Sequence, residues 1–256
     1  MLRTHRKPEC HITVDLEEPL TGYACSQLII EIVKYVMYQK QQIPLSCDSL
    51  IKLHATSKPT DRNFSSMQNL VDSLSNISNQ LALQFTIDDC EVKEIVIVIG
   101  ATIVSPKFYI VIELPPTILN SNIHLEYQHP FRKSLTTVMR SIIKSTEFQD
   151  EMIIPLGLTN TFVFVRKKDP YKISEFFIPK PQFSLSSQNT NSFRIKLNYN
   201  ENNRLNCDCD NFIKVYHDSQ NKIYLKKDYI EEKFNSEITY QWYQSKEVLK
   251  GFKFLI

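Results

Sequence analysis

The stretch Leu28 to Leu45, LIIEIVKYVMYQKQQIPL, constrains the fold of this chain more than any other segment. Its apolar residues recur at helical spacing and form one wide stripe, which consists of Leu28, Ile29, Ile32, Val33, Val36 and Met37. Neither Gly nor Pro interrupts the pattern before Pro44, so we predict a helix that ends just before that proline. A long helix that is apolar on one side is typical of the central packing element of a single domain.

A polar cluster, Tyr38-Gln39-Lys40-Gln41-Gln42, lies where this apolar stripe ends. Helical rotation places Gln39 on the side of Leu28 and Ile32, at the edge of the buried face. Periodicity alone favours a solvated helix end here. The alternative is a polar contact at the border of a protein interface.

The composition excludes several classes of protein. The 256 residues can bury the core of one large domain or two small ones. A net charge of +2, from 30 basic and 28 acidic side chains, gives no argument for nucleic acid or an anionic membrane as a partner. No apolar run is long enough to span a bilayer, and no apolar signal core follows the basic N-terminus, so we do not expect secretion. The six irregularly spaced cysteines are then expected to be reduced thiols in a cytosolic or nuclear protein.

No motif in the sequence predicts an active site. The four glycines are isolated, whereas a loop that cradles phosphates needs clustered glycines. The carboxylates between Asp88 and Glu91 are neighbours in a turn, whereas acid–base catalysis needs two carboxylates in different environments. A nucleophile and a base assembled from distant Cys and His residues stays an open alternative.

Two groups of metal-ligating residue types occur, and neither has the spacing of a usual metal site. Cys207-Asp208-Cys209 with His217 departs from the zinc pattern, in which about two to four residues separate paired cysteines. His124 and His129 do not share a helix face, and Pro130 follows them directly. We therefore predict neither a metal nor a cofactor.

Apolar periodicity predicts an α+β domain over residues 11–256, preceded by a tail at 1–10. The run Ile95 to Ile99 is unbroken and consists entirely of β-branched residues, which is typical of a strand buried on both faces. Three helices set against a predominantly antiparallel sheet are expected. The first expected helix begins at about Gly22, and the other two span 65–85 and 130–148, with a helical turn at 48–53. Strands are expected at 11–17, 95–99, 108–114, 161–166, 193–199, 212–217 and 222–226.

The third expected helix has a wider apolar face than packing on one side requires. Its core stripe consists of Phe131, Leu135, Val138 and Ile142. Met139 and Ile143 lie on one flank of this stripe, next to Arg132 and Thr136. These two apolar side chains either lie at the rim of the core or form an exposed edge that meets another protein.

Several segments resemble the comet family of HORMA-fold adaptors, which silence the spindle assembly checkpoint. The segments are VKYVMYQKQQIPL, IVIVIGATIVSPKFYIVIEL, PFRKSLTTVMRSIIKSTEF, Phe177-Ile178-Pro179-Lys180, and the end of the chain from Tyr240. MYQKQQIPL and Lys250-Gly251-Phe252 are the most specific of them. The ranges 156–175 and 184–228 show no such resemblance.

The resemblance implies a non-enzymatic adaptor with a HORMA-like domain. Such an adaptor binds the closed conformer of the checkpoint HORMA protein, called Mad-two here, and presents it to an AAA+ ATPase of the Pch-two family. The ATPase then opens Mad-two and so disassembles the mitotic checkpoint complex. The expected location is the nucleus and cytoplasm, with spindle or kinetochore association in mitosis.

The resemblance also assigns roles to residues by position. Gln39 and Met139, with Arg132 and Ile143 beside them, would contact Mad-two. Met139 replaces a large aromatic residue of the family; methionine still fills an apolar pocket, and part of the contact would move to Ile143. Pro179 and Lys180 would contact the ATPase. The segment from Tyr240 would occupy the domain's own ligand-binding position.

Two other functions stay open. The first is a HORMA-type adaptor for another partner in DNA repair, meiosis or autophagy, which would need an exchangeable C-terminal segment to capture a foreign peptide. The second is a small hydrolase, which would need a thiol with a lowered pKa.

Overall fold

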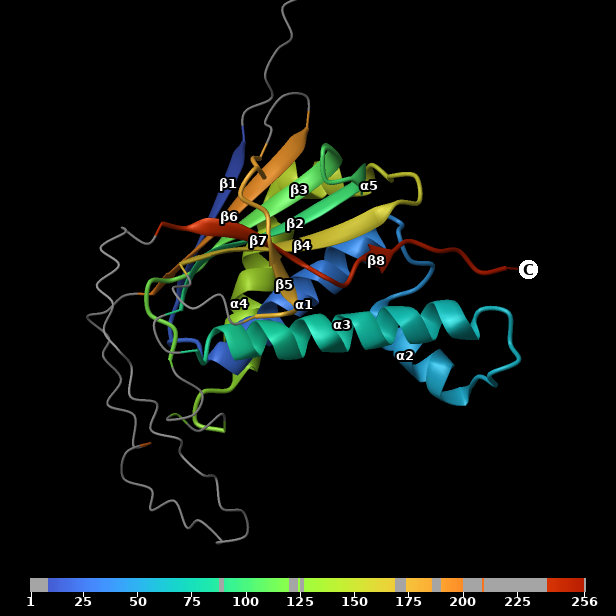
Figure 1. Cartoon of the computed structure of the whole chain (residues 1–256), viewed down its shortest axis with the longest axis horizontal. Coiled ribbons are helices and arrows are strands. Elements are labelled where there is room, and N and C mark those ends of the chain that lie inside the picture. The colour runs from blue at the N-terminus through green and yellow to red at the C-terminus, as the bar shows by residue number, and fades with distance from the viewer. Residues whose placement is uncertain are drawn as a thin grey trace, which may run out of the picture.

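The computed structural model describes residues 9–87, 90–119, 124, 127–168, 174–185, 190–199, 209 and 239–255. In these ranges, helices lie against an eight-stranded sheet (Figure 1). The helices are α1 (Gly22–Gln39), α2 (Cys47–Thr56), α3 (Phe64–Gln84), α4 (Phe131–Lys144) and α5 (Thr146–Ile153). The strands are β1 (Cys10–Leu16), β2 (Glu91–Thr102), β3 (Ser105–Glu113), β4 (Asn160–Lys168), β5 (Phe177–Pro179), β6 (Asn191–Tyr199), β7 (Gln241–Ser245) and β8 (Leu249–Lys250).

The strands follow the order β1-β6-β3-β2-β4-β7-β5, and β8 also pairs with β4. Strand β6 runs parallel to β1 and β3, whereas the other pairs are antiparallel. Strand β7 lies between β4 and β5 and is hydrogen-bonded along both edges. The prediction of an α+β fold with a predominantly antiparallel sheet and a folded-back C-terminal segment is confirmed.

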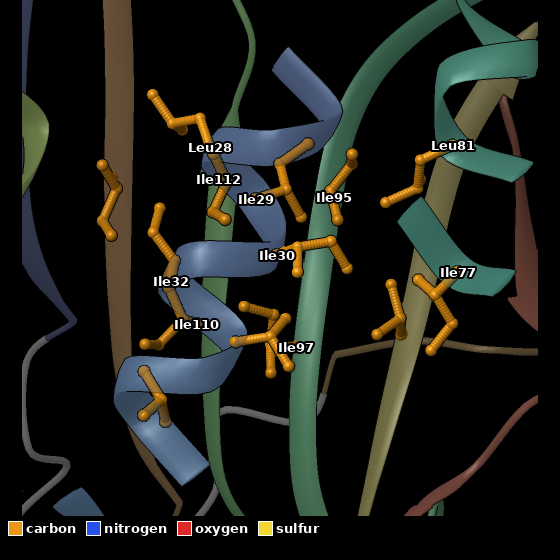
Figure 2. Close-up of a cluster of buried hydrophobic side chains, with 14 of the residues drawn as sticks. Leu28, Ile29, Ile30, Ile32, Ile77, Leu81, Ile95, Ile97, Ile110 and Ile112 are labelled. Atoms are coloured by element: carbon orange, nitrogen blue, oxygen red, sulfur yellow. The ribbon is translucent and has the colours of Figure 1, made fainter. Parts of the chain in front are cut away.

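Strand β2 is buried on both faces, as its unbroken apolar run predicts. Ile95 and Ile97 face α1 and α3, and Figure 2 shows their side chains directed toward the helical layer. That layer supplies Leu28, Ile29, Ile30 and Ile32 from α1 and Ile77 and Leu81 from α3. Val96 and Val98 face the opposite side, where Phe164 of β4 lies beside them in the sheet and Phe183 packs against the cluster. We call this opposite side the second face of the sheet.

Helix α1 ends earlier than predicted, at Gln39 rather than just before Pro44. Gln41 takes a left-handed backbone conformation with a φ of 53°. The N–H of Gln41 donates to the carbonyl of Tyr38 at 3.0 Å, and the N–H of Gln42 donates to the carbonyl of Met37 at 2.8 Å. These two bonds satisfy the last carbonyls of the helix in a Schellman motif, so no proline is needed to end it.

The predicted third helix consists of two helices. Ser145 has an extended backbone between α4 and α5, and its hydroxyl accepts a hydrogen bond from the N–H of Phe148 at 3.3 Å. Ser145 thus caps the N-terminus of α5 and interrupts the pattern that predicted one helix. The predicted turn at 48–53 is the full helix α2, so the described residues form five helices where three were expected.

Several other predictions concern residues that lie partly or wholly outside the described ranges. Strand β1 begins at Cys10, within the predicted tail, and residues 1–8 lie outside the description. The predicted hairpin at 212–226 and the acidic pair Asp88-Asp89 also lie outside it. None of the helices in the described part of the chain has both the length and the apolar character needed to cross a membrane.

Candidate protein-interaction surfaces

A groove of about 200 Å³ lies between α1, the start of α2 and α4. We call it the helical groove. Its lining residues are Glu31, Lys34, Tyr35, Tyr38, Ser46, Cys47, Asp48, Leu135 and Met139. The polar rim includes an ion pair between Glu31 and Lys34, with 2.6 Å from Oε1 to Nζ. Apolar and aromatic side chains inside a polar rim are typical of a protein interface.

The residues predicted to contact Mad-two lie in or near this groove to different degrees. Met139 is half-buried and lines the groove, and Ile143, one turn later on α4, is 54% exposed. Gln39 does not line it but follows Tyr35 by one turn of α1. Arg132 is exposed in the first turn of α4, about 10 Å along the axis from Met139.

The environment of Gln39 is compatible with a role in binding. Its side chain is half-buried, and its amide has no hydrogen-bond partner among the residues that the structure describes. An amide at the edge of an apolar surface can satisfy its hydrogen-bonding groups with a bound protein.

Tyr35 and Tyr38 are interface candidates that the sequence alone did not single out. Both line the helical groove, and Tyr38 is 45% exposed. Tyrosine is enriched in interfaces because its ring is apolar and its hydroxyl group is polar. The position of Tyr38 in the polar cluster beside Gln39 was the available signal.

Lys40 and Gln42, from the same polar cluster, are fully buried, so a solvated helix end is wrong for these two residues. Lys40 Nζ lies 2.8 Å from Glu151 Oε1 and donates to the carbonyl of Ile154 at 3.1 Å. The side-chain oxygen of Gln42 accepts from the N–H of Thr159 at 2.9 Å. The partners are more than 100 residues away in sequence, which is why local periodicity does not reveal them.

The residues predicted to contact the ATPase, Pro179 and Lys180, lie at the end of β5, which is an edge strand of the sheet. Pro179 is exposed there, next to Ile178, which is 42% exposed. A proline fits an edge strand because no ladder hydrogen bond is required of it. The N–H of Lys180 donates to the carbonyl of Trp242 at 2.7 Å, so β7 fixes the backbone at this point.

After Lys180 the chain turns onto the second face of the sheet. Phe183 stacks on Phe164, with ring centroids 4.0 Å apart, and meets Trp242 edge-to-face at 5.5 Å. Pro179 and Lys180 line a hollow of about 630 Å³ between this segment and the sheet. In the described part of the chain, the Lys180 ammonium group makes no ion pair, so its charge is available to an acidic partner.

The thiols near the core do not have the pKa of a nucleophile. Burial raises the pKa of Cys25 well above its usual range and raises that of Cys47 to about 12. Burial also raises the pKa of Cys10. A catalytic thiol needs a lowered pKa, so these three cysteines do not support the hydrolase alternative.

One group of metal-ligating side chains does assemble, although sequence spacing gave no reason to expect it. The ligand atoms of His124, His129 and Cys209 lie within 4.8 Å of one another. Each of the two groups dismissed above thus contributes to one cluster. Cys207 and His217, from the same sequence pattern as Cys209, lie outside the described residues.

Comparison with known families gives one match. Residues 3–191 match the family model described as "p31comet: Mad1 and Cdc20-bound-Mad2 binding". A search of curated proteins found no significant match. The matched range includes all six predicted interface residues, whereas β7 and β8 lie beyond it.

Proposed function

Because the chain belongs to the p31comet family, we propose that it is an adaptor that binds Mad2 in the closed, Cdc20-bound form. The family match confirms the resemblance stated above, and the α+β architecture agrees with the HORMA-like fold of that family. The observation that carries the proposal is the surface around the helical groove. There α1 and α4 expose apolar side chains beside the Gln39 amide, which has no hydrogen-bond partner in the described part of the chain.

We place Met139, Ile143, Tyr38 and Gln39 at the centre of the Mad2 contact. Met139 can adapt its shape to a pocket on the partner, and Ile143 has more than half of its surface left to bury. Arg132 lies further along α4, where an exposed charge contributes more to association rate and specificity than to affinity.

Calorimetry with purified closed Mad2 tests this contact. The double variant Gln39→Ala with Met139→Ala should bind at least about tenfold more weakly, a loss of about 1.4 kcal/mol. Ile143→Ala should weaken binding as well, whereas its matched control Ile153→Ala, which removes a 76% exposed isoleucine from α5, should not. Unchanged affinity in the double variant, or an equal effect of Ile153→Ala, would reject the assignment.

We further propose that the β5 edge presents bound Mad2 to an AAA+ ATPase of the Pch-two family. Pro179 and Ile178 offer an exposed apolar edge, and Lys180 offers a positive charge for an acidic patch. On this proposal the ATPase opens Mad2, the mitotic checkpoint complex comes apart, and the adaptor itself catalyses nothing. The proposal places the protein in the nucleus and cytoplasm, at the spindle or kinetochore in mitosis.

Charge reversal tests the ATPase contact. Lys180→Glu should weaken ATPase binding. Added salt should reduce the difference in ATPase affinity between this variant and the unmodified chain, because salt screens exposed charges. The control Lys58→Glu changes an exposed lysine outside the β5 edge and should leave binding unchanged. Equal losses for both variants would indicate a general effect of net charge and would exclude a specific contact at Lys180.

The arrangement of the C-terminal segment argues against the alternative HORMA adaptor. That alternative needs a segment that leaves its place so that a foreign peptide can bind. Strand β7 is hydrogen-bonded to β4 and to β5, and the N–H of Phe252 donates to the carbonyl of Gln42 at 2.8 Å. Displacing this segment would break bonds on both sides of β7.

A further inference from the structure

Three metal-ligating side chains meet just before the N-terminus of α4. His124 and His129 come from the connection between β3 and α4, and Cys209 comes from the connection between β6 and β7. The Sγ atom of Cys209 lies 3.5 Å from Nε2 of His129, and the two histidine rings meet edge-to-face with centroids 5.4 Å apart. All three ligand atoms lie within 4.8 Å of one another.

These separations fit a tetrahedral metal centre. Bonds of about 2.3 Å from zinc to sulfur and about 2.0 Å from zinc to nitrogen place the two ligand atoms about 3.5 Å apart at the tetrahedral angle. The observed 3.5 Å between Cys209 and His129 matches that edge. The limit of 4.8 Å exceeds that edge by about 1.3 Å, so half-buried His124 would move closer to the other two ligands when an ion binds.

The burial of the ligands and their chemical type are both suited to a zinc ion. His129 is 5% exposed and Cys209 is 3% exposed, so the two ligands lie away from bulk water. Two imidazoles and one thiol suit a borderline-soft divalent cation, whereas magnesium and calcium prefer oxygen ligands. We propose that His124, His129 and Cys209 bind a zinc ion, with the fourth position open to water.

Gln128 would support the thiolate form of Cys209. Its Oε1 lies 2.8 Å from Cys209 Sγ, where it accepts a hydrogen bond from the thiol. When zinc replaces the thiol proton, a half-turn of the Gln128 amide places its N–H₂ group against the sulfur instead. The same side chain can therefore satisfy the cysteine before and after the ion binds.

The ion would fix the start of the helix that carries Met139 and Ile143. His129 directly precedes Pro130, the N-cap of α4, and is 80 residues from Cys209 in the sequence. Near this point Lys133 of α4 pairs with Glu17 and Glu18, each at 2.9 Å, but such exposed pairs stabilise a fold only weakly. A metal ion that joins distant segments contributes its binding free energy to the folded state.

Cobalt titration of the full chain, after treatment with a chelator, tests the site. We expect one equivalent of Co²⁺ to bind with the d–d bands of a tetrahedral ion and a sulfur-to-cobalt charge-transfer band, and Zn²⁺ to displace it. His124→Asn, His129→Asn and Cys209→Ser should each weaken cobalt binding by more than about tenfold. The controls His11→Asn and Cys90→Ser remove the same residue types elsewhere and should bind like the unmodified chain.

Two results would overturn the proposal. One is a spectrum without the sulfur band, and the other is a sulfur band that forms with unchanged cobalt affinity in Cys209→Ser or in either histidine variant. Circular dichroism checks the fold of each variant, and His124→Asn decides the matter if a substitution at buried Cys209 unfolds the chain. The titration contains no Mad2, so its failure would leave the proposed function untouched.

Discussion

At the residue scale, Lys40 is a charged side chain that the fold buries completely. Its ammonium group is fully buried, pairs with Glu151 and lies over the ring of Phe108, 4.8 Å from the centroid. Asn191 also donates to the Glu151 carboxylate at 2.7 Å. The pair therefore links the end of α1 to α5 and β6, and the loss of one partner leaves a buried charge without its opposite charge.

We predict that Lys40→Met lowers the free energy of unfolding by about 3–5 kcal/mol. Adding Glu151→Gln should recover part of this loss, because the second change removes the unpaired charge. Urea unfolding of both single variants and the double variant measures the coupling. Lys34→Met is the matched control, since its partly exposed pair with Glu31 should contribute less than about 1 kcal/mol. Equal losses at Lys34 and Lys40 would contradict the prediction.

Gln41 has a backbone conformation that favours glycine, and its side chain is exposed. We predict that Gln41→Val lowers the free energy of unfolding by about 1–2 kcal/mol, because a β-branched residue is strained at this positive φ. Gln41→Gly should leave it unchanged or raise it by up to about 1 kcal/mol. Thermal and urea unfolding measure both changes, and a stable valine variant would be inconsistent with the left-handed conformation.

The buried thiols predict a dependence on alkaline pH. Because burial raises the pKa of Cys47 to about 12, the folded state keeps this thiol neutral where the unfolded chain would ionise it, above about 8.5. Its contribution to stability is thus complete below about pH 8.5 and is lost as the pH rises toward 12. We expect iodoacetamide at pH 8 to modify Cys47 far more slowly in the folded chain than in urea, as mass spectrometry of peptides can measure. Equal rates would show that the thiol is accessible and not buried.

At the element scale, the C-terminal segment is held by a close backbone approach at Gly251. Its N–H donates to the carbonyl of Thr159 at 2.8 Å. A β-carbon at this position would lie 3.0 Å from that same carbonyl oxygen and 2.8 Å from the side-chain oxygen of Gln42. Since Gln42 Oε1 also accepts from the N–H of Thr159, it has little freedom to move.

We predict that Gly251→Ala lowers the free energy of unfolding by about 1–3 kcal/mol through overpacking. The matched control is Gly157→Ala, because a β-carbon there meets nothing within 4 Å. Hydrogen exchange should also show faster exchange at Phe252, whose N–H donates to Gln42, in the Gly251 variant alone. Identical behaviour of the two alanine variants would argue against the tight fit.

At the scale of the whole molecule, the two proposed contacts lie on opposite faces of the sheet. The helical groove is part of the helical layer, whereas the segment from Lys180 to Leu185 covers the second face. Phe183 anchors that segment through its stack on Phe164. Each surface therefore has its own packing support, and a substitution in one should leave the other intact.

We predict that Phe183→Ala weakens ATPase binding and leaves the affinity for closed Mad2 unchanged. The substitution removes the stacked ring that holds the chain next to Pro179 and Lys180. Met139→Ala should have the opposite pattern. Calorimetry with each partner measures the separation, and emission of the single tryptophan, Trp242, reports whether the second face has loosened. Loss of both affinities in the Phe183 variant would show that the surfaces are coupled.

The sequence by itself determined the elements whose burial follows a simple period. The unbroken run of β-branched residues from Ile95 to Ile99 indicated a strand covered on both faces, and the apolar stripe of α1 indicated a central helix. The wide apolar flank of α4 likewise led to Ile143, which is exposed as an interface residue would be. These features depend on local spacing, because a regular backbone directs side chains at a fixed period.

Only the tertiary structure decided which polar residues are buried and which distant residues meet. Lys40 and Gln42 have the composition of a solvated helix end, but segments more than 100 residues away supply their partners. His129 and Cys209 come together across 80 residues in the same way. The physical reason is that the cost of burying a polar group is offset by whichever donor or acceptor the fold brings to it. That partner has no fixed spacing in the sequence, so no local pattern identifies it.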